Sequence, residues 1–146
     1  MDTINILKSS GNDIAAAIGL LETNLLPVED IQEGTLQFFL AETDIETAGC
    51  VAIEYYGESG LLRSLAVRND FRNRGIAEQL VDTIVQEAKA KGVTRLYLLT
   101  TTTDKYFARL GWQVIDRNRV PATILASSEF ASVCPSTAVC MSFCIK

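Results

Sequence analysis

The strongest hydrophobic pattern in the chain lies in residues 75–91, where apolar residues recur every three to four positions. The apolar stripe consists of Ile76, Leu80, Ile84 and Ala88, with Ala77, Val81 and Val85 beside it. This spacing predicts an amphipathic α-helix whose acidic and amide side chains face solvent. Short apolar runs at residues 62–67 and 95–100 flank the helix and predict two strands. A strand–helix–strand unit of this length joins parallel neighbours in a sheet.

Alternating apolar positions and turn residues predict the remaining elements. Further strands are expected at residues 3–8, 37–42, 48–56, 112–115 and 138–145, and further helices at residues 13–25, 104–110 and 122–132. Residues 28–34 are expected to form a short helix or a loop, and residues 57–60 a hairpin turn. This mixture indicates an α/β (α+β) fold. Residues 1–146 suffice for one domain with a substantial core.

Composition excludes several classes of function. The net charge of −5 argues against nucleic-acid binding, which needs a broad positive surface. The chain has no histidine, which excludes Ser-His and Cys-His nucleophiles and the usual histidine-containing zinc sites. A charged-then-apolar leader and a bilayer-spanning apolar run are both missing, so we expect a cytoplasmic protein. We expect the four cysteines to be reduced.

The segment before the long helix carries positive charge. Arg72 and Arg74 precede Gly75, and the first N–H groups of a helix have no intrahelical acceptor. Such a junction suits a phosphate-bearing ligand. The segment lacks the Gly-Lys-Ser/Thr of a nucleotide P-loop and the spaced glycines of a dinucleotide fingerprint. An ordinary strand–helix turn with solvated arginines is the alternative.

The sequence around this segment resembles a known family. Residues 72–77, RNRGIA, match the R/Q-x-x-G-x-G/A loop of the GNAT N-acetyltransferases, and SLAV, RLYLLTTTT and YFARLGW occur in that family's order. Within the superfamily, SLAV with LLTTTTDKYFARLGW resembles the acetyltransferase domain of N-acetylglutamate synthase. The segments GCVAIEYYG and GLLRSLAV and the tail VPATILASSEFASVCPSTAVCM resemble N-acetyltransferases found with arsenic-resistance genes.

The resemblance implies the GNAT fold, a mixed and mostly antiparallel sheet with a central parallel strand pair that splays apart. It also implies acetyl-CoA as co-substrate, no metal, and direct attack of an amine on the thioester in a ternary complex. The pantetheine arm would pair with the backbone of Leu65, Ala66 and Val67. The pyrophosphate would lie on the loop residues Arg72, Asn73, Arg74, Gly75, Ile76 and Ala77.

Two catalytic positions depart from the family pattern. Many relatives protonate the leaving thiolate with a tyrosine at the position of Phe107, which here would only contact the cofactor. Tyr106 is the candidate proton donor, although one helical position turns a side chain by about 100°, and a half-buried core tyrosine is the alternative. Many relatives carry a glutamate where this chain has Leu61 and Leu62, so Glu54 on the neighbouring strand is the candidate base, acting through a water. The alternative for Glu54 is an edge-facing carboxylate or an ion pair with Arg63.

Four residues are candidates for acceptor binding: Arg63, Ser64, Thr100 and Thr101. An arginine at the acceptor end of a strand suits bidentate recognition of a carboxylate, whereas an internal ion pair is the alternative. For the threonines the alternative is a polar turn that caps the next helix.

The tail cysteines form no C-x-x-C pair. We therefore expect Cys134, Cys140 and Cys144 to be small buried residues rather than ligands of zinc or trivalent arsenic.

The expected function is transfer of an acetyl group from acetyl-CoA to a primary amine of a small molecule, such as an amino acid or an analogue. Acetylation of a protein N-terminus or lysine is one alternative, and a catalytically silent CoA-binding or ligand-sensing module is another. The expected partner is the small-molecule amine, without nucleic acid or membrane. A monomer and a homodimer are both compatible with the sequence.

Overall fold

The computed structural model describes residues 4–8, 36–44, 46–72, 75–101, 103–125 and 138–145. Within these ranges, seven strands form one sheet in the order β1-β2-β3-β4-β5-β7-β6. The strands are β1 Asn5–Lys8, β2 Leu36–Glu42, β3 Thr47–Tyr56, β4 Ser59–Val67, β5 Arg95–Thr100, β6 Gln113–Val114 and β7 Val139–Cys144. The predictions for residues 13–25 and 28–34 lie outside the described residues.

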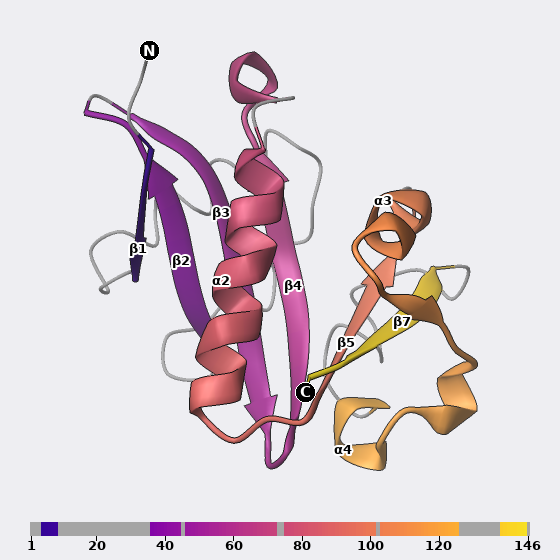
Figure 1. The fold of residues 1–146 in the computed structure, drawn as a ribbon. Coiled ribbons are helices and arrows are strands. Elements are labelled where there is room, and N and C mark those ends of the chain that lie inside the picture. The colour runs from indigo at the N-terminus through magenta and orange to yellow at the C-terminus, as the bar shows by residue number, and fades with distance from the viewer. Residues whose placement is uncertain are drawn as a thin grey trace.

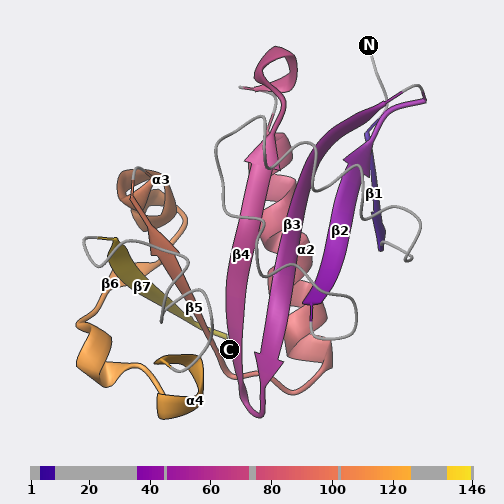
Figure 2. The ribbon, with the colours of Figure 1, turned by 180° about the vertical axis from the view of Figure 1, so that it is seen from behind.

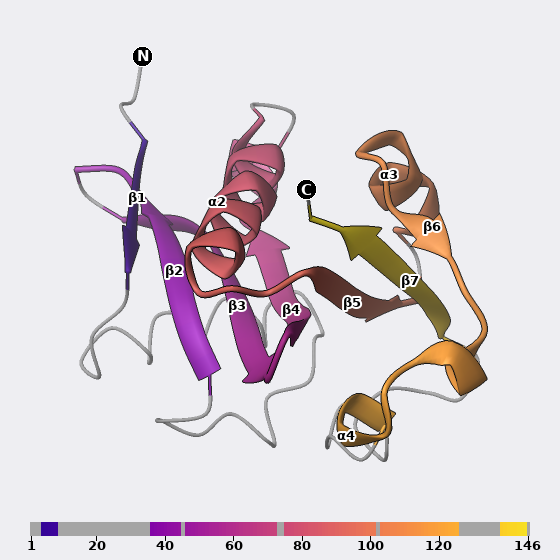
Figure 3. The ribbon, with the colours of Figure 1, turned by 60° about the horizontal axis from the view of Figure 1, so that its bottom comes forward.

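The described helices are α2 Ile76–Ala90, α3 Asp104–Arg109 and α4 Ala122–Leu125, with 3-10 turns η2 Asn69–Phe71 and η3 Arg117–Arg119. Helix α2 lies across the face of β3 and β4 (Figure 1), and the strands lie in front of it in the reverse view (Figure 2). The elements β5, β6, β7, α3 and α4 gather on the other side of the β4–β5 junction (Figure 3). The described part of the chain contains no helix both long and apolar enough to cross a membrane.

Most predicted elements are confirmed to within one or two residues at each end. The hairpin turn is shorter than expected, because β4 already begins at Ser59. The expected strand at residues 112–115 is reduced to β6, since the Trp112 side chain is buried and its backbone N–H donates to the Phe107 carbonyl oxygen at 3.0 Å. The expected helix at residues 122–132 is described only through Leu125.

The long helix forms where the hydrophobic stripe predicts it. Gly75 occupies its N-cap position with φ +77°, a conformation that glycine adopts without steric cost. The buried residues of the helix are Ile76, Leu80, Val81, Ile84 and Ala88. They pack on the core side chains of the sheet, so burial of this one face holds α2 against the strands.

The two central parallel strands pair over only three positions. Ser59, Gly60 and Leu61 of β4 lie opposite Arg95, Leu96 and Tyr97 of β5, and the pairing ends there. Beyond this point β5 continues its ladder with β7. The predicted splaying of the parallel pair is therefore confirmed.

A β-bulge accompanies the divergence of β4 from β5. Ala52 lies opposite Arg63 and Cys50 lies opposite Ala66, so β4 carries one residue more than β3 over this stretch. Ser64 has φ +59°, the only left-handed non-glycine residue in the described part of the chain. Bulges bend a strand and increase its twist. The bulge therefore gives a local cause for the turn of β4 away from β5.

Helix α2 approaches β3 closely at Gly49. A Cβ atom there would lie 2.9 Å from the Ala66 carbonyl oxygen and 3.1 Å from Cδ1 of Leu80. We expect Gly49→Ala to lower the free energy of unfolding by about 1–3 kcal/mol through overpacking, measured by urea denaturation. Gln86→Ala on the exposed face of α2 is the control, expected within about 0.5 kcal/mol of wild type. Equal stabilities of the two variants would contradict the close approach.

Candidate active site

The gap between β4 and β5 exposes a stretch of strand edge. Leu65, Ala66 and Val67 end β4 beyond the last residue that pairs with β5. Ala66 and Val67 are buried and Leu65 is half-buried, so the side chains hold this edge in the core. Backbone polar groups in such a position need partners. An extended ligand with amide groups can supply them in the manner of an added strand.

The bulge also fixes a carbonyl group and a thiol beside this edge. The Cys50 Sγ atom donates to the Ser64 carbonyl oxygen at 3.4 Å. Burial raises the pKa of the Cys50 thiol to about 12, against a smaller lowering by a hydrogen bond with the Ala66 backbone. Cys50 is therefore a buried neutral thiol rather than a nucleophile.

The loop between β4 and α2 places positive charge at the top of the gap. The Arg72 Nε atom donates to the Val67 carbonyl oxygen at 3.3 Å, which ties the exposed arginine to the end of β4. Gly75 is exposed, and a Cβ atom built on it would meet nothing within 4 Å. The Gln79 N–H donates to the Gly75 carbonyl oxygen, which leaves the N–H groups of the first turn of α2 without an intrahelical acceptor.

The remaining loop residues divide into three groups. Asn73 and Arg74 lie outside the described residues. Ile76 is buried in the core and Ala77 is half-buried, so they can contribute their backbone to a ligand. Arg68 forms ion pairs with Glu46 and Asp70, each with a closest contact of 3.2 Å.

A buried ion pair links β3 and β4 next to the bulge. The Arg63 Nη1 atom lies 3.0 Å from Glu54 Oε1, with side-chain exposures of 2% and 12%. The Tyr56 hydroxyl donates to Glu54 Oε2 at 2.7 Å, and Arg63 Nε donates to Ser64 Oγ at 3.3 Å. Both carboxylate oxygens of Glu54 therefore have hydrogen-bond donors. The structure thus contains the internal ion pair between Glu54 and Arg63 that the sequence allowed as the alternative to a functional role for each residue.

The hydroxyl groups after β5 form a polar turn. Thr100 Oγ1 accepts from the Thr103 N–H at 2.9 Å and also pairs with the Thr103 hydroxyl. Thr103 occupies the N-cap position of α3, yet its side chain makes no capping hydrogen bond. Thr101 is exposed. The turn thus orders Thr100 at the end of β5, opposite the β4 edge.

The two aromatic residues of α3 have different environments. Phe107 is buried and packs edge-on against Tyr106 and Trp112, with ring centroids 5.4 and 5.5 Å apart. Tyr106 is half-buried. Burial raises the pKa of the Tyr106 hydroxyl, the Glu78 carboxylate raises it further, and the Arg109 guanidinium lowers it. Tyr106 is therefore within electrostatic reach of α2 across the gap and stays protonated at neutral pH.

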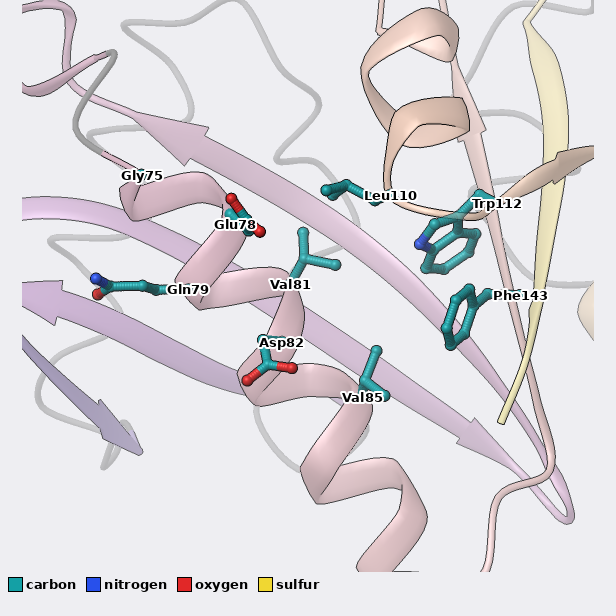
Figure 4. Close-up of a pocket in the computed structure, with 9 residues that line it drawn as sticks. All are labelled: Gly75, Glu78, Gln79, Val81, Asp82, Val85, Leu110, Trp112 and Phe143. Carbon is teal, nitrogen blue, oxygen red and sulfur yellow. The ribbon is translucent and has the colours of Figure 1, made fainter. Parts of the chain in front are cut away.

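A cavity of about 490 Å³ opens between α2 and the elements beside β5. Its α2 wall consists of Gly75, Glu78, Gln79, Val81, Asp82 and Val85. Leu110, Trp112 and Phe143 form the opposite wall, with β4 passing between the two walls in Figure 4. Sequence reasoning placed Glu78 and Asp82 on a solvated helix face and missed this role. Their one-turn spacing was visible, but nothing local indicated a facing wall.

Cys140 and Cys144 are not among the residues that line this cavity. Burial raises the pKa of the Cys140 thiol to about 11, and the nearby Arg117 lowers it. Cys140 is buried as expected, whereas the expectation of a buried Cys144 is wrong, because Cys144 ends β7 and is exposed. Cys134 lies outside the described residues. Among the residues that the structure describes, no three His, Cys, Asp or Glu side chains cluster in a way that could hold a metal ion.

The family model and the relatives that match this chain are acetyltransferases. The family model described as "Acetyltransferase (GNAT) domain" matches residues 34–114. An uncharacterized N-acetyltransferase of Chlorobaculum tepidum is 32% identical over 77% of this chain and 71% of its own length. An amino-acid acetyltransferase of Neisseria meningitidis serogroup A is 30% identical over 65% of this chain. This chain spans only 22% of that relative.

Solved structures share the fold. N-acetylglutamate synthase from Neisseria gonorrhoeae, complexed with coenzyme A and N-acetyl-glutamate, has a TM-score of 0.83 at 22% identity over 99% of this chain and 35% of its own. Rv2747 from Mycobacterium tuberculosis, in complex with CoA, has a TM-score of 0.81 at 21% identity over 97% of this chain and 99% of its own. The predicted fold class, with its splayed parallel pair, is confirmed.

Proposed function

The chain belongs to the GNAT acetyltransferase family and is an acetyl-CoA-dependent N-acetyltransferase, and on that premise we propose that it acetylates the primary amine of a small molecule, an amino acid or an amino-acid analogue. One observation carries the proposal: β4 leaves β5 after Leu61, and the freed edge leads directly into the loop at Arg72 and Gly75. An edge followed by a cationic loop suits a donor with an amide arm and a pyrophosphate.

The acyl donor would lie along this edge. The pantetheine amides pair with the backbone of Leu65 and Val67, and Ala66 holds the strand in the core. The pyrophosphate is proposed to lie on the loop residues Arg72, Asn73, Arg74 and Gly75 and on the first N–H groups of α2, at Ile76 and Ala77. Gly75 lets the backbone approach without a side chain in the way.

The reaction is proposed to be direct attack. The neutral amine nitrogen forms a bond to the thioester carbonyl carbon and the C–S bond breaks. The nitrogen gives up one proton to a base or to solvent water, and the leaving CoA thiolate takes one proton. A backbone N–H at the end of β4 stabilises the negative charge on the carbonyl oxygen. The high pKa values of Cys50 and Cys140 argue against an acyl-cysteine intermediate on either residue. Tyr106, held neutral by its environment, is the proposed proton donor to the thiolate.

The acceptor is proposed to lie at the Glu54–Arg63 pair. Glu54 fixes the plane of the guanidinium, and a fixed guanidinium is what bidentate recognition of a carboxylate requires. Ser64, Thr100 and Thr101 would add hydrogen bonds to the acceptor. The names of the amino-acid acetyltransferase relatives and the N-acetyl-glutamate complex support an amino-acid acceptor. A base role for Glu54, acting through a water, remains the competing proposal for that residue.

Specific observations favour a second candidate, a CoA-binding or ligand-sensing module without catalysis. Tyr106 is displaced by one position from the family tyrosine, and both Glu54 oxygens are engaged by other side chains. Acetylation of a protein N-terminus or lysine differs from the main proposal only in the acceptor. The resemblance to arsenic-resistance-associated enzymes suggests that arsenical or phosphinate amino-acid analogues belong in the acceptor screen.

We propose further that residues 1–146 act as one domain in the cytoplasm, as a monomer or a homodimer. The continuous sheet from β1 to β6 supports a single domain. The free thiols of Cys50, Cys140 and Cys144 fit a reducing compartment.

The first test is donor binding. Wild-type protein is expected to bind acetyl-CoA and CoA saturably in calorimetry, and Arg72→Ala to weaken this binding about tenfold, as expected for loss of a charged phosphate contact. Arg68→Ala is the matched control, because its guanidinium is already held by Glu46 and Asp70. Equal losses in the two variants would argue against a phosphate site at Arg72.

The second test is chemistry. Thiol release is measured with amino acids, their analogues and peptides as acceptors. Turnover with amino acids supports the main proposal, whereas turnover only with peptides supports the protein-acetylating alternative. Saturable CoA binding without thiol release on any amine would support the silent module.

A further inference from the structure

We propose that Cys50 is a positioning residue for acetyl transfer: its thiol holds the Ser64 carbonyl group at the β4 bulge and thereby aims the Leu65 N–H into the gap between β4 and β5. The inference rests on the proposed function, which places the thioester beside a backbone N–H at the end of β4. Cys50 acts through the backbone and does not itself contact the substrates. A buried thiol without covalent chemistry of its own thus has a role in the reaction.

The bulge leaves part of β4 outside the strand ladder. The pairing with β3 passes from Arg63 directly to Ala66, and neither Ser64 nor Leu65 has a register partner on β3 or β5. Ser64 has φ +59°, a left-handed conformation that costs free energy in a residue with a side chain. Such a conformation persists only where the surrounding groups hold it. The bulge therefore needs contacts other than the regular ladder.

The Cys50 side chain supplies these contacts from the opposite strand. Its Sγ atom donates to the Ser64 carbonyl oxygen at 3.4 Å, and a hydrogen bond with the Ala66 backbone reaches the same thiol. Cys50 is completely buried, so water does not compete for these groups. Burial raises the pKa of the thiol to about 12, so the S–H donor is present at neutral pH. One sulfur atom therefore links the residues on both sides of Leu65.

The Ser64 carbonyl group and the Leu65 N–H belong to one peptide unit. In a planar trans peptide these two bonds point in opposite directions, and the described part of the chain contains no cis peptide bond. Strand β3 lies on one side of β4 and β5 on the other (Figure 2). A carbonyl group held toward Cys50 of β3 therefore turns the Leu65 N–H toward the side from which β5 has diverged. An N–H aimed this way can meet negative charge on a thioester oxygen.

The Ser64 side chain is held by a separate contact. Arg63 Nε donates to Ser64 Oγ at 3.3 Å, and the Arg63 side chain is only 2% exposed. The thiol and the guanidinium thus act on different atoms of Ser64, the carbonyl oxygen and the hydroxyl. Removing the thiol therefore frees the peptide unit to turn without releasing the side chain.

The test compares Cys50→Ala with Cys50→Ser in the full chain. Alanine removes the donor, whereas serine keeps an O–H that can donate to the same carbonyl oxygen. Thiol release is measured with acetyl-CoA and the best acceptor among the twenty amino acids. Cys50→Ala is expected to lower kcat about tenfold and to change the KM for acetyl-CoA less than about twofold, as for an interaction made mainly in the transition state. Cys50→Ser is expected to keep at least about a third of the wild-type kcat, since it keeps a hydrogen bond.

Packing alone predicts the reverse order. A buried side chain that only fills space is replaced better by alanine than by serine, whose hydroxyl is costly without a partner. Cys140→Ala and Cys140→Ser are the matched controls, because Cys140 is also a buried thiol and lies on β7, outside the bulge. Both are expected to keep the wild-type kcat. Equal kcat in the two Cys50 variants, a higher kcat in Cys50→Ala, or an equal loss in Cys140→Ala would overturn the positioning role.

The S–H stretching band in the Raman spectrum tests the hydrogen bond without an activity assay, and it does not require Cys50→Ala to fold. The wild type is expected to show a band shifted to lower frequency by hydrogen bonding, which Cys50→Ser loses and Cys140→Ser retains. A Cys50 band at the frequency of a free thiol would overturn the inference while leaving the proposed function intact. A wild type that releases no thiol from acetyl-CoA with any amine would refute the proposed function itself, and the positioning role would fall with it.

Discussion

Glu54→Gln is expected to lower the free energy of unfolding by about 3 kcal/mol. The substitution leaves the Arg63 guanidinium charged, with a side chain only 2% exposed and its 3.0 Å counter-ion removed. Breaking one partner of a buried pair costs about 3–5 kcal/mol, and the glutamine keeps part of the hydrogen bonding with Tyr56. Urea denaturation monitored by circular dichroism measures the change.

The matched control is Glu46→Gln. Glu46 also pairs with an arginine, at 3.2 Å, but the side chains of Glu46 and Arg68 are 33% and 40% exposed. Exposed pairs of this kind contribute less than about 1 kcal/mol. If Glu46→Gln and Glu54→Gln destabilise the protein equally, the Glu54 pair is not a buried one.

The same variant separates the two proposals for Glu54. A base acting through water predicts a fall in turnover of about a hundredfold and loss of the acidic limb of the kcat/KM profile. A carboxylate that only positions Arg63 predicts a raised KM for a carboxylate-bearing acceptor with an unchanged pH profile. Rates are measured at a temperature where the variant is fully folded.

Tyr106→Phe is expected to lower kcat about a hundredfold, with little change in acetyl-CoA binding. The hydroxyl is the only group removed, and its raised pKa makes it an acid that remains protonated through neutral and mildly alkaline pH. A proton donor is lost as pH rises through its pKa, so wild-type kcat should fall only above pH 10, the ordinary value for tyrosine. The Tyr106→Phe variant should lack this limb of the profile.

Tyr55→Phe is the control for loss of a tyrosine hydroxyl. Tyr55 lies on β3 near the end of α2, with the Lys91 ammonium 5.9 Å from its ring centroid. Its buried hydroxyl has no hydrogen-bond partner among the described residues. We expect unchanged kcat and no loss of stability, since removing an unsatisfied buried hydroxyl carries no penalty. Unchanged kcat in Tyr106→Phe as well would leave positioning of the substrates as the source of catalysis.

Much of the local structure around the proposed donor site was predictable from local patterns. The α2 stripe, the glycine at its start and the apolar runs on either side each follow from neighbouring residues. The acceptor side was less predictable. Glu54 and Arg63 were each candidates for a functional role or an ion pair, because one strand pattern cannot tell which residues of the next strand lie opposite.

The displaced tyrosine illustrates the same limit. The sequence places Tyr106 and Phe107 next to each other on a short helix, where one of them must face the core. Packing against Trp112 buries Phe107 and leaves Tyr106 beside the gap, in reach of Glu78. Which of the two residues is buried depends on where α3 lies relative to β6 and α2. The helical period alone does not determine this position.

The sequence by itself determined the elements of this protein and the cationic turn at Gly75, because these depend on residues within a few positions of one another. It also determined the parallel strand pair, because a strand–helix–strand connection of this length joins parallel strands. Only the tertiary structure decided which charges meet. The hairpin between β3 and β4 sets a register in which Glu54 lies opposite Leu61 and Ala52 opposite Arg63, and this brings Glu54 diagonally to Arg63. The divergence of β5 from β4 places Trp112 opposite Asp82. Both arrangements join residues from separate elements, whose distances are set by register and strand direction rather than by any local period.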